Sequence, residues 1–405
     1  MRLGRIVRTA TAAALGFVLG AVLTLSIQSV GQPVETGAPV RPEPAPSPTE
    51  QPVEVHPERP GTYLAWTPGG LPDDLRQRLR ELPGVRRSVV VVSGTAWLTR
   101  SYAADGTLVD RPHRGLAVPI EIAAVHPDEY APFLPPADRG VLASLRQGEG
   151  VLSQSSASLR GLAEEGRLQF GPVTVPVPAA LPDELMGATE LLVSRATAAR
   201  LGVSRERYAL LHPAKEVSTP RLAAMLRRII TPGALLRVRA PGETPFFRHG
   251  DAVLPPIRLK ELFGEFHATP IADGYLRIDP AWQRRNIGVE WVPVLGEVRC
   301  HRALFPQLRA ALREVVRQGL APEIHRSMYG GCYSPRFALR SPTAGLSHHA
   351  WGIAIDINVA ENPYGARPTM DPRIVAAFKR HGFNWGGEWL VPDGMHFEFG
   401  RFVRE

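Results

Sequence analysis

The sequence lacks the features by which basic proteins usually bind nucleic acids. Its 405 residues carry a formal net charge of +8, and most of the positive charge comes from arginine, with little lysine. The basic residues do not alternate with aromatic residues in a stripe, and no known nucleic-acid-binding module is present. We therefore expect no nucleic-acid partner, despite the charge.

Residues 61–245 are equally poor in chemical motifs. They contain no cluster of metal ligands, no nucleophile elbow and no phosphate-binding loop. Helix-like and strand-like stretches are mixed along this segment, and we expect a separate α/β domain large enough to bury its own core. Gly148–Ser153 and the helix-like stretch after it resemble extracytoplasmic domains of bacterial transport permeases. Docking to a protein partner, regulation and a bare spacer role all stay open.

Local patterns in this segment predict four elements. Helices are expected where apolar residues recur at helical spacing and a capping residue or glycine marks an end. A run of valines, stopped by Gly94, predicts a buried strand. The expected elements are helices over 75–82, 194–201 and 219–230 and a strand over 88–93.

The amino terminus predicts a membrane anchor. Residues 1–8 contain three arginines, and the uncharged residues 9–30 include an apolar stretch long enough to cross a bilayer as a helix. No clear Ala-x-Ala-like cleavage site follows it. We expect an uncleaved single-pass anchor in a bacterial cell membrane, with the remainder extracytoplasmic; secretion after signal cleavage is the alternative.

A proline-rich spacer is expected after the anchor. Residues 31–60 contain nine prolines interspersed with Glu, Val and Thr. Such a composition cannot bury a core and favours an extended, semi-rigid chain. The spacer would set how far the folded part reaches from the membrane.

Two short segments near the carboxyl terminus contain the side chains of a catalytic metal site. Residues 347–356 read Ser-His-His-Ala-Trp-Gly-Ile-Ala-Ile-Asp, and residues 393–398 read Asp-Gly-Met-His-Phe-Glu. A hydrolytic zinc ion needs three protein ligands, an open fourth position and a nearby base. Asp393, on a Pro-Asp-Gly turn, is the candidate base. The candidate ligands of one Zn²⁺ are His349, Asp356 and His396.

The spacing of these residues favours two adjacent strands. Bulky and small residues alternate over 351–358, as in a strand with one face in a core. Its other face is nearly bare before Asp356, so we expect metal and substrate to approach the backbone at Gly352 and Ala354. In the second segment His396 shares a face with Glu398. Pairing of the two strands would bring Asp356 and His396 together.

These motifs resemble the zinc D-Ala-D-Ala carboxypeptidase and dipeptidase family, which includes vancomycin-resistance peptidases and several phage endolysins. The family pattern is Ser-x-His-x-x-Gly-x-Ala-x-Asp, followed by an acidic residue three positions before a His-aromatic pair. The resemblance covers roughly residues 250–403. It implies a small α+β zinc domain, of the type shared with hedgehog proteins, that acts on cell-wall peptides. The matching residues are Ser347, His349, Gly352, Ala354, Asp356, Asp393 and His396.

The resemblance also implies an arginine before the first ligand, which orients substrate and steadies the oxyanion. Arg336 is the preferred candidate and Arg326 the second. Trp385 and Trp389 belong to a Trp-Gly-Gly-x-Trp element similar to one in the family. They either line the substrate cleft or pack in the core.

Three further polar side chains flank the ligands. Ser347 and Glu398 are candidates to support the ligands from behind, and Glu398 can hydrogen-bond a ligand imidazole. A plain solvated or salt-bridged carboxylate is the alternative for Glu398. His348 is expected to have no role, because neighbouring side chains on an extended chain point in opposite directions.

The two cysteines, Cys300 and Cys332, lie in the same carboxyl-terminal part. An even number in an exported chain predicts one disulfide. Zinc ligation by this pair is not expected because the histidine and aspartate set is complete, and a reduced buried pair is the other alternative.

The sequence as a whole predicts an α+β protein: a membrane anchor, an α/β domain at 61–245 and a zinc peptidase domain at 246–405. The expected reaction is hydrolysis of peptidoglycan stem peptides, first of all as a D-Ala-D-Ala carboxypeptidase. An endopeptidase that cuts L-Ala-D-Glu or cross-bridge bonds would show the same ligands. A non-catalytic cell-wall-binding or scaffold protein is the remaining alternative.

Overall fold

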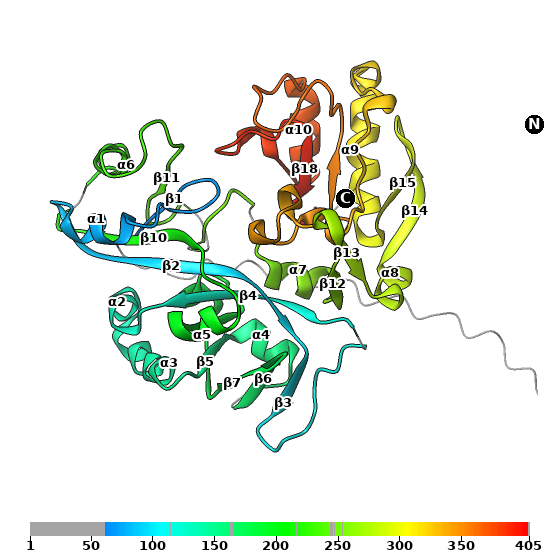
Figure 1. Cartoon of the computed structure of the whole chain (residues 1–405). Coiled ribbons are helices and arrows are strands. Elements are labelled where there is room, and N and C mark those ends of the chain that lie inside the picture. The colour runs from blue at the N-terminus through cyan, green and yellow to red at the C-terminus, as the bar shows by residue number, and fades with distance from the viewer. Residues whose placement is uncertain are drawn as a thin grey trace, which may run out of the picture. The chain divides into compact units, whose positions relative to one another are not determined.

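The computed structural model describes residues 61–113, 115–162, 165–215, 217–243, 246, 248–252 and 254–403 (Figure 1). The predicted basic segment 1–8, anchor 9–30 and spacer 31–60 lie outside the described residues. Among the residues described, no helix combines the length and apolarity needed to cross a bilayer. The described residues all belong to one compact unit, and the predicted domain boundary at 245 stays a prediction.

A mixed eight-stranded sheet dominates the first part of the described chain. Neighbouring strands pair antiparallel except β4 with β9 and β5 with β8, which are parallel. The strand order is β11-β1-β10-β2-β4-β9-β5-β8. Its strands are β1 Tyr63–Trp66, β2 Val85–Leu98, β4 Val118–Val125, β5 Gly150–Ser153, β8 Ala179–Leu181, β9 Leu191–Ser194, β10 Glu206–Pro213 and β11 Arg237–Arg239.

Helices and a smaller sheet complete this part. The small sheet has the order β3-β6-β7, with β3 Arg100–Ala103, β6 Gly166–Phe170 and β7 Val173–Val177. The helices are α1 Leu75–Glu81, α2 Pro127–Tyr130, α3 Ala143–Arg146, α4 Gln154–Leu159, α5 Arg195–Arg200 and α6 Thr219–Arg227. The predicted helices are confirmed, although α6 ends before the expected residue 230.

The valine run that predicted a strand is buried on both faces. Val89 and Val91 join one apolar cluster while Val90 joins another, because successive side chains point to opposite faces. The expected end at Gly94 was wrong, since β2 continues to Leu98. A Cβ on Gly94 would lie 3.1 Å from the Val203 side chain. The glycine therefore permits close packing rather than ending the strand.

The carboxyl-terminal part is built from short strands and two longer helices around one apolar core. The strands are β12 Ala268–Pro270, β13 Leu276–Ile278, β14 Ile287–Val292, β15 Gly296–His301, β16 Ala354–Asp356, β17 Phe383–Trp385 and β18 His396–Phe399. The helices are α7 Pro256–Phe263, α8 Pro280–Asn286, α9 Phe305–Arg317 and α10 Pro372–Arg380. Helices and strands in several sheets confirm the mixed α+β class.

The strand expected over 351–358 is much shorter in the structure. Only Ala354–Asp356 forms β16, and Trp351 and Gly352 lie in the turn before it. Gly352 has φ +71°, and a Cβ there would lie 2.8 Å from the His301 backbone nitrogen. The expected approach of metal to the Gly352 backbone was therefore wrong: this backbone packs against β15, where its carbonyl accepts a hydrogen bond from His301 at 2.8 Å.

Buried charges join α7 to the eight-stranded part. Lys260 donates to Glu190 at 2.8 Å and lies 2.9 Å from Glu265, while Arg160 donates to Glu265 at 2.8 Å. Lys260, Glu190 and Arg160 are almost completely buried. Two cations thus meet two carboxylates, as burial of charge requires. The same lysine also donates to the Pro119 carbonyl at 2.6 Å.

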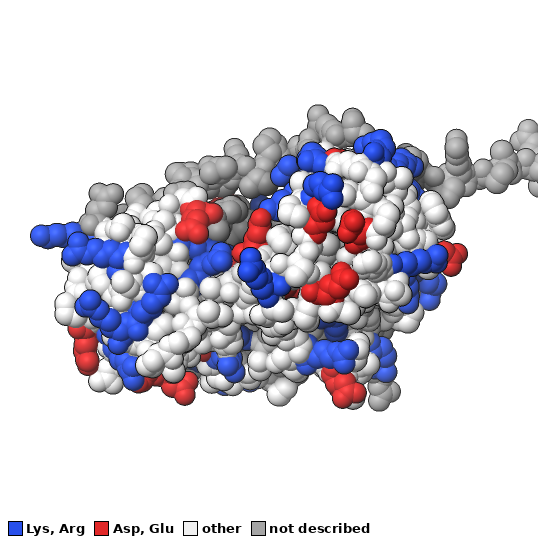
Figure 2. Space-filling model, turned by 90° about the horizontal axis from the view of Figure 1, so that it is seen from above, with Lys and Arg blue, Asp and Glu red and all other residues white. Residues whose placement is uncertain are grey.

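Surface charge is dispersed on the face shown in Figure 2. Lysine and arginine side chains are spread over this face with aspartate and glutamate side chains among them. In the described part of this face the basic side chains form no continuous stripe. The expectation of no nucleic-acid partner stays a prediction.

Candidate metal centre

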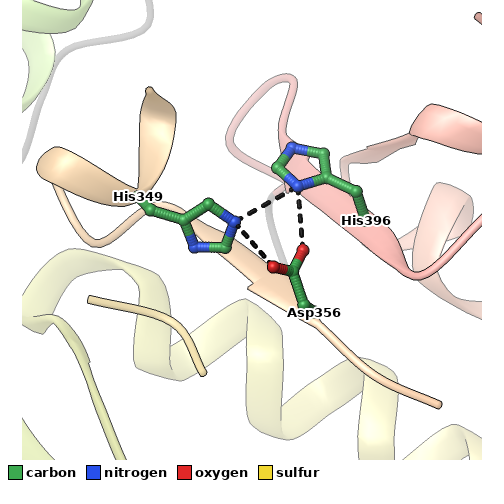
Figure 3. A group of neighbouring side chains, drawn as sticks. All are labelled: His349, Asp356 and His396. Carbon is green, nitrogen blue, oxygen red and sulfur yellow. Dashed lines mark hydrogen bonds and ion pairs between the residues drawn. The ribbon is translucent and has the colours of Figure 1, made fainter. Parts of the chain in front are cut away.

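Three buried polar side chains converge from two strands and a turn. Asp356 in β16 is the Cα partner of His396 in β18, and His349 lies in the short 3₁₀ turn His348–Ala350 (Figure 3). His349 Nε2 lies 3.2 Å from Asp356 Oδ2, and His396 Nδ1 lies 3.0 Å from Asp356 Oδ1. The two imidazole nitrogens are 3.3 Å apart. The predicted pairing of the two segments is confirmed.

Each imidazole is oriented by a contact on its other nitrogen. His349 Nδ1 donates to the Cys332 carbonyl at 2.8 Å, because a carbonyl can only accept. This contact places the hydrogen on Nδ1 and leaves Nε2 as the free lone pair. His396 Nε2 lies 3.3 Å from Glu398 Oε2, which leaves Nδ1 facing Asp356. The two nitrogens, His349 Nε2 and His396 Nδ1, therefore point into the same small space. Burial lowers the pKa of His396, but its hydrogen bonds to Asp356 and Glu398 outweigh burial and raise the pKa to about 10, so a metal ion would replace a proton on Nδ1.

The donor set fits a divalent metal ion. One ligand atom from each of the three residues lies within 4.8 Å of the others, and all three residues are buried. Burial alone would raise the pKa of Asp356, but His349 and His396 outweigh it and hold the pKa well below its usual range. The carboxylate is therefore ionised and available as a ligand. Two imidazoles and one carboxylate with room for a further ligand suit catalytic zinc.

A disulfide and a hydroxyl fix the backbone around His349. Cys300 and Cys332 are joined, with their Cα atoms 5.3 Å apart. The bond ties the end of β15 to the segment whose carbonyl orients His349. Ser347 Oγ accepts a hydrogen bond from the His349 backbone nitrogen at 3.4 Å. These contacts hold the first candidate ligand in place, and the carbonyl of Cys332 could not have been found from sequence patterns.

Glu398 and His348 form a buried pair behind the centre. Burial would raise the pKa of Glu398, but His348 and His396 lower it well below its usual range. Glu398 Oε2 lies 2.7 Å from His348 Nδ1, in addition to its contact with His396. Sequence reasoning expected no role for His348. That prediction assumes an extended chain at His348, whereas His348–Ala350 is a 3₁₀ turn.

Replacing Glu398 with glutamine should weaken metal binding by about tenfold to a hundredfold. The amide keeps the shape but removes the charge that strengthens His396 as a donor. We would measure zinc affinity by competition with a chromogenic chelator. Glu388→Gln is the control, since Glu388 is exposed and pairs with Lys379. An unchanged affinity in Glu398→Gln would show that this carboxylate does not support the ligand.

Asp393 lies beside the centre in a half-buried position. Two backbone hydrogen bonds hold the Pro-Asp-Gly turn. The Asp393 carbonyl accepts a hydrogen bond from His396 N at 3.1 Å, and Asp393 N donates one to Gly386 O at 2.8 Å. Its Oδ1 atom is buried without a hydrogen-bond partner in the described structure. Burial raises the pKa of Asp393 to about 6, and the nearby negative charge of Asp356 adds to the increase. A carboxylate that accepts a proton more readily than usual fits a general base.

Hydrolysis should therefore lose rate in acid as Asp393 becomes protonated. The ionised form is the one that accepts a proton, so kcat/KM should fall as pH drops through the pKa of this group. A bound dication would lower that pKa, so the midpoint should lie between the ordinary aspartate value of 3.8 and about 6. Zinc content is measured at each pH, because loss of the metal would also lower the rate. A rate independent of pH over this range in zinc-loaded protein would contradict the assignment.

The two candidate arginines differ in position. Arg336 lines a cavity of about 490 Å³ together with His349 and Asp356, and its Nη2 lies 3.8 Å from Asp356 Oδ2. Arg326 is not among the residues that line this cavity, and its guanidinium lies against the backbone at Gly296, where an added Cβ would be 2.5 Å from Nη2. The structure therefore brings Arg336, and not Arg326, next to the candidate metal ligands.

The two tryptophans also have different surroundings. The Trp385 ring stacks on Phe397 in the core, and its Nε1 donates to Gly394 O at 2.9 Å. The Trp389 ring centre lies 5.1 Å from that of His396. Core packing thus describes Trp385, whereas Trp389 is beside a candidate ligand. Tyr275, which no sequence pattern singled out, lines the cavity of Arg336.

Comparison with known proteins identifies the family resemblance of this centre. Residues 340–399 match a family model described as D-alanyl-D-alanine carboxypeptidase. The predicted resemblance is confirmed for these residues. They include all three candidate ligands, Asp393 and Glu398, whereas Arg336 lies outside the match. The match supports a peptidase related to peptidoglycan metabolism, and the histidine and aspartate group supports metal dependence.

Other comparisons add little. The search of curated proteins finds no match. One similar solved structure is the periplasmic region of MacB from Actinobacillus actinomycetemcomitans, at 12% identity and a TM-score of 0.32, covering 47% of this chain and 94% of that one. Another is the extracellular domain of the noncanonic ABC-type transporter YknZ from Gram-positive bacteria. It has 13% sequence identity and a TM-score of 0.29, and the match covers 44% of this chain and 99% of that one. The resemblance of residues 148–153 to permease domains stays a prediction.

Proposed function

We propose that this protein is a zinc-dependent peptidase that hydrolyses peptidoglycan stem peptides, with removal of the terminal residue from D-Ala-D-Ala as the preferred reaction. One observation carries the proposal: His349 Nε2, an Asp356 oxygen and His396 Nδ1 converge within 4.8 Å, beside a cavity that also contains Arg336. The match of residues 340–399 to the carboxypeptidase family supports the choice of substrate.

His349, Asp356 and His396 would hold one Zn²⁺, and Asp393 would transfer the proton. When bound, zinc supplies Lewis acidity that polarises a carbonyl and makes water more acidic. Asp393 accepts the proton of the attacking water and later delivers it to the leaving amine. Its half-buried position and raised pKa suit both transfers.

Arg336 would bind the negative charge of the substrate. Its guanidinium stays protonated and offers planar paired donors to a carboxylate or to a developing oxyanion. It lines the same cavity as His349 and Asp356, so one substrate can contact it and the centre together. In a carboxypeptidase the natural group for this arginine is the terminal carboxylate.

We place the enzyme on the outer side of a bacterial membrane. The amino-terminal sequence supports a single-pass anchor followed by a proline-rich spacer. The net charge of +8 would favour contact with anionic wall polymers. Secretion after signal cleavage is the alternative to anchoring.

An endopeptidase that cuts L-Ala-D-Glu or cross-bridge bonds is the second candidate. The same three metal ligands would serve either peptidase, because the loops around the cavity determine which peptide bond is cut. A wall-binding protein without catalysis is the third candidate, and such a protein would have no use for the half-buried carboxylate of Asp393 beside the ligands.

The test is digestion of purified muropeptides by the zinc-loaded full-length chain, read by mass spectrometry. Loss of one D-Ala that stops on chelation would establish the carboxypeptidase. A different chelator-sensitive fragment would identify an endopeptidase instead. No fragment from protein with a full zinc complement would overturn the proposed catalysis.

A further inference from the structure

Asp251 joins the segment that carries the candidate base to a different part of the fold. Its Oδ2 atom accepts a hydrogen bond from the Leu390 backbone nitrogen at 2.6 Å, and its side chain is 7% exposed. Leu390 lies three residues before Asp393, between the Trp389 ring and the Pro-Asp-Gly turn. The carboxylate therefore contacts the middle of residues 386–393, which we name the base segment.

The other side of Asp251 faces strand β11 of the eight-stranded sheet. Asp251 Oδ1 lies 3.2 Å from Arg237 Nη1 and 3.7 Å from Arg239 Nη2. Arg239 also donates to the Gly250 carbonyl at 2.7 Å and to the Arg248 carbonyl at 3.3 Å. Both arginines thus hold the short turn that presents Asp251. Through β11, which pairs with β1, this contact is continuous with the sheet.

The base segment has further contacts within the carboxyl-terminal part, among them the Trp389 ring beside His396 and the ion pair of Glu388 with Lys379. Trp389 N and Asp393 N both donate to the Gly386 carbonyl, at 3.0 Å and 2.8 Å, and Gly365 N donates to the Pro392 carbonyl at 2.7 Å. The Leu390 side chain packs on an apolar cluster of the eight-stranded sheet rather than on the core around the centre. Leu390, in the middle of the base segment, is therefore held from the sheet by one hydrogen bond and one apolar contact.

We propose that Asp251 is a positioning residue, through which the eight-stranded part of the chain holds the base segment so that Asp393 faces the metal centre. This inference rests on the proposed role of Asp393 as the base. A hydrogen bond from a backbone nitrogen to an ionised carboxylate is stronger than one between neutral groups. Loss of this bond would matter, because a displacement of about 1 Å at a catalytic group can cost about a hundredfold in rate. It also gives residues 61–245, which lack chemical motifs, a role in catalysis.

Asp251→Ala and Asp251→Asn separate positioning from mere packing. Alanine removes the acceptor for Leu390 N, so kcat should fall by about tenfold to a hundredfold with KM and zinc content near those of the wild type. Asparagine keeps an acceptor oxygen and should restore kcat to within about threefold. Asp371→Ala is the matched control, because Asp371 likewise accepts from a backbone nitrogen, at 2.7 Å, and pairs with an arginine, without contacting the base segment.

Hydrogen exchange on the same full-length variants tests the contact without reference to activity. In Asp251→Ala, peptides covering residues 386–393 should exchange faster, while peptides covering β16 should not change. Asp371→Ala should leave the base segment unchanged. Unaltered exchange of the base segment in a folded Asp251→Ala protein would overturn the proposed contact.

The kinetic and exchange results distinguish this inference from the proposed function. Faster exchange with an unchanged kcat would overturn the positioning role while leaving the peptidase intact. An effect on KM alone, or an equal loss in Asp251→Asn and Asp251→Ala, would do the same. If the wild type cleaves no muropeptide, the proposed function fails, whereas the exchange result still decides whether Asp251 holds the base segment.

Discussion

Asp393→Asn should lower kcat by about a hundredfold to ten-thousandfold while the protein keeps its zinc. The amide has the shape of the carboxylate but cannot accept and return a proton, and general acid-base catalysis contributes about this much. Asp393 Oδ1 is buried without a hydrogen-bond partner in the described structure, so the substitution breaks no side-chain hydrogen bond of that atom. The measurement is single-turnover cleavage of the muropeptide that the wild type cuts, with zinc determined on the same samples.

The control for Asp393→Asn is Glu388→Gln, a carboxylate-to-amide change in the same base segment. Glu388 is exposed and pairs with Lys379, so its loss should change kcat by less than about twofold. Wild-type turnover by zinc-loaded Asp393→Asn would remove Asp393 as the base. It would leave the metal centre itself untouched.

His396→Ala and His349→Ala should abolish both zinc binding and hydrolysis. Each removes one of three protein ligands, and the remaining two cannot complete a catalytic zinc site. Polarisation of the scissile carbonyl by the metal is worth several kcal/mol, so the rate should fall by several orders of magnitude. The measurements are zinc content by elemental analysis and cleavage at saturating substrate.

A control histidine tests whether the loss is specific to the centre. His381 pairs with Glu314 at 2.8 Å and is partly exposed, so His381→Ala should keep both zinc and activity. Full zinc content in His396→Ala would show that the ion is held elsewhere. Loss of zinc with retained activity would separate catalysis from the metal altogether.

The local part of the centre could be predicted because its residues are close in sequence. Within the ten residues from Ser347 to Asp356 the alternation of bulky and small side chains already predicts a strand, and its last part, Ala354–Asp356, forms. Pairing of β16 with β18 then brings the His396 imidazole of the second segment next to Asp356. Patterns of this kind report which side chains share a face, and that is enough to select His349, Asp356 and His396.

The rest of the centre depends on long-range contacts that no local pattern encodes. The Cys332 carbonyl orients His349 across 17 residues, and Asp251 contacts Leu390 across 139. The sequence pattern predicts that Gly352 opens the backbone to the metal, whereas its positive φ and its contact with His301 serve the packing against β15. In sequence, a glycine that opens the backbone to a ligand looks the same as one that permits close packing. Only its three-dimensional neighbours distinguish the two roles.

The central claim is that one zinc ion held by His349, Asp356 and His396 makes this chain a hydrolase. The most direct measurement is the return of muropeptide cleavage as Zn²⁺ is added stepwise to the chelated full-length protein. We expect activity to rise linearly and to level off at one ion per chain, with no recovery in His396→Ala. Full activity in the metal-free protein, or no cleavage at any zinc content, would contradict the account.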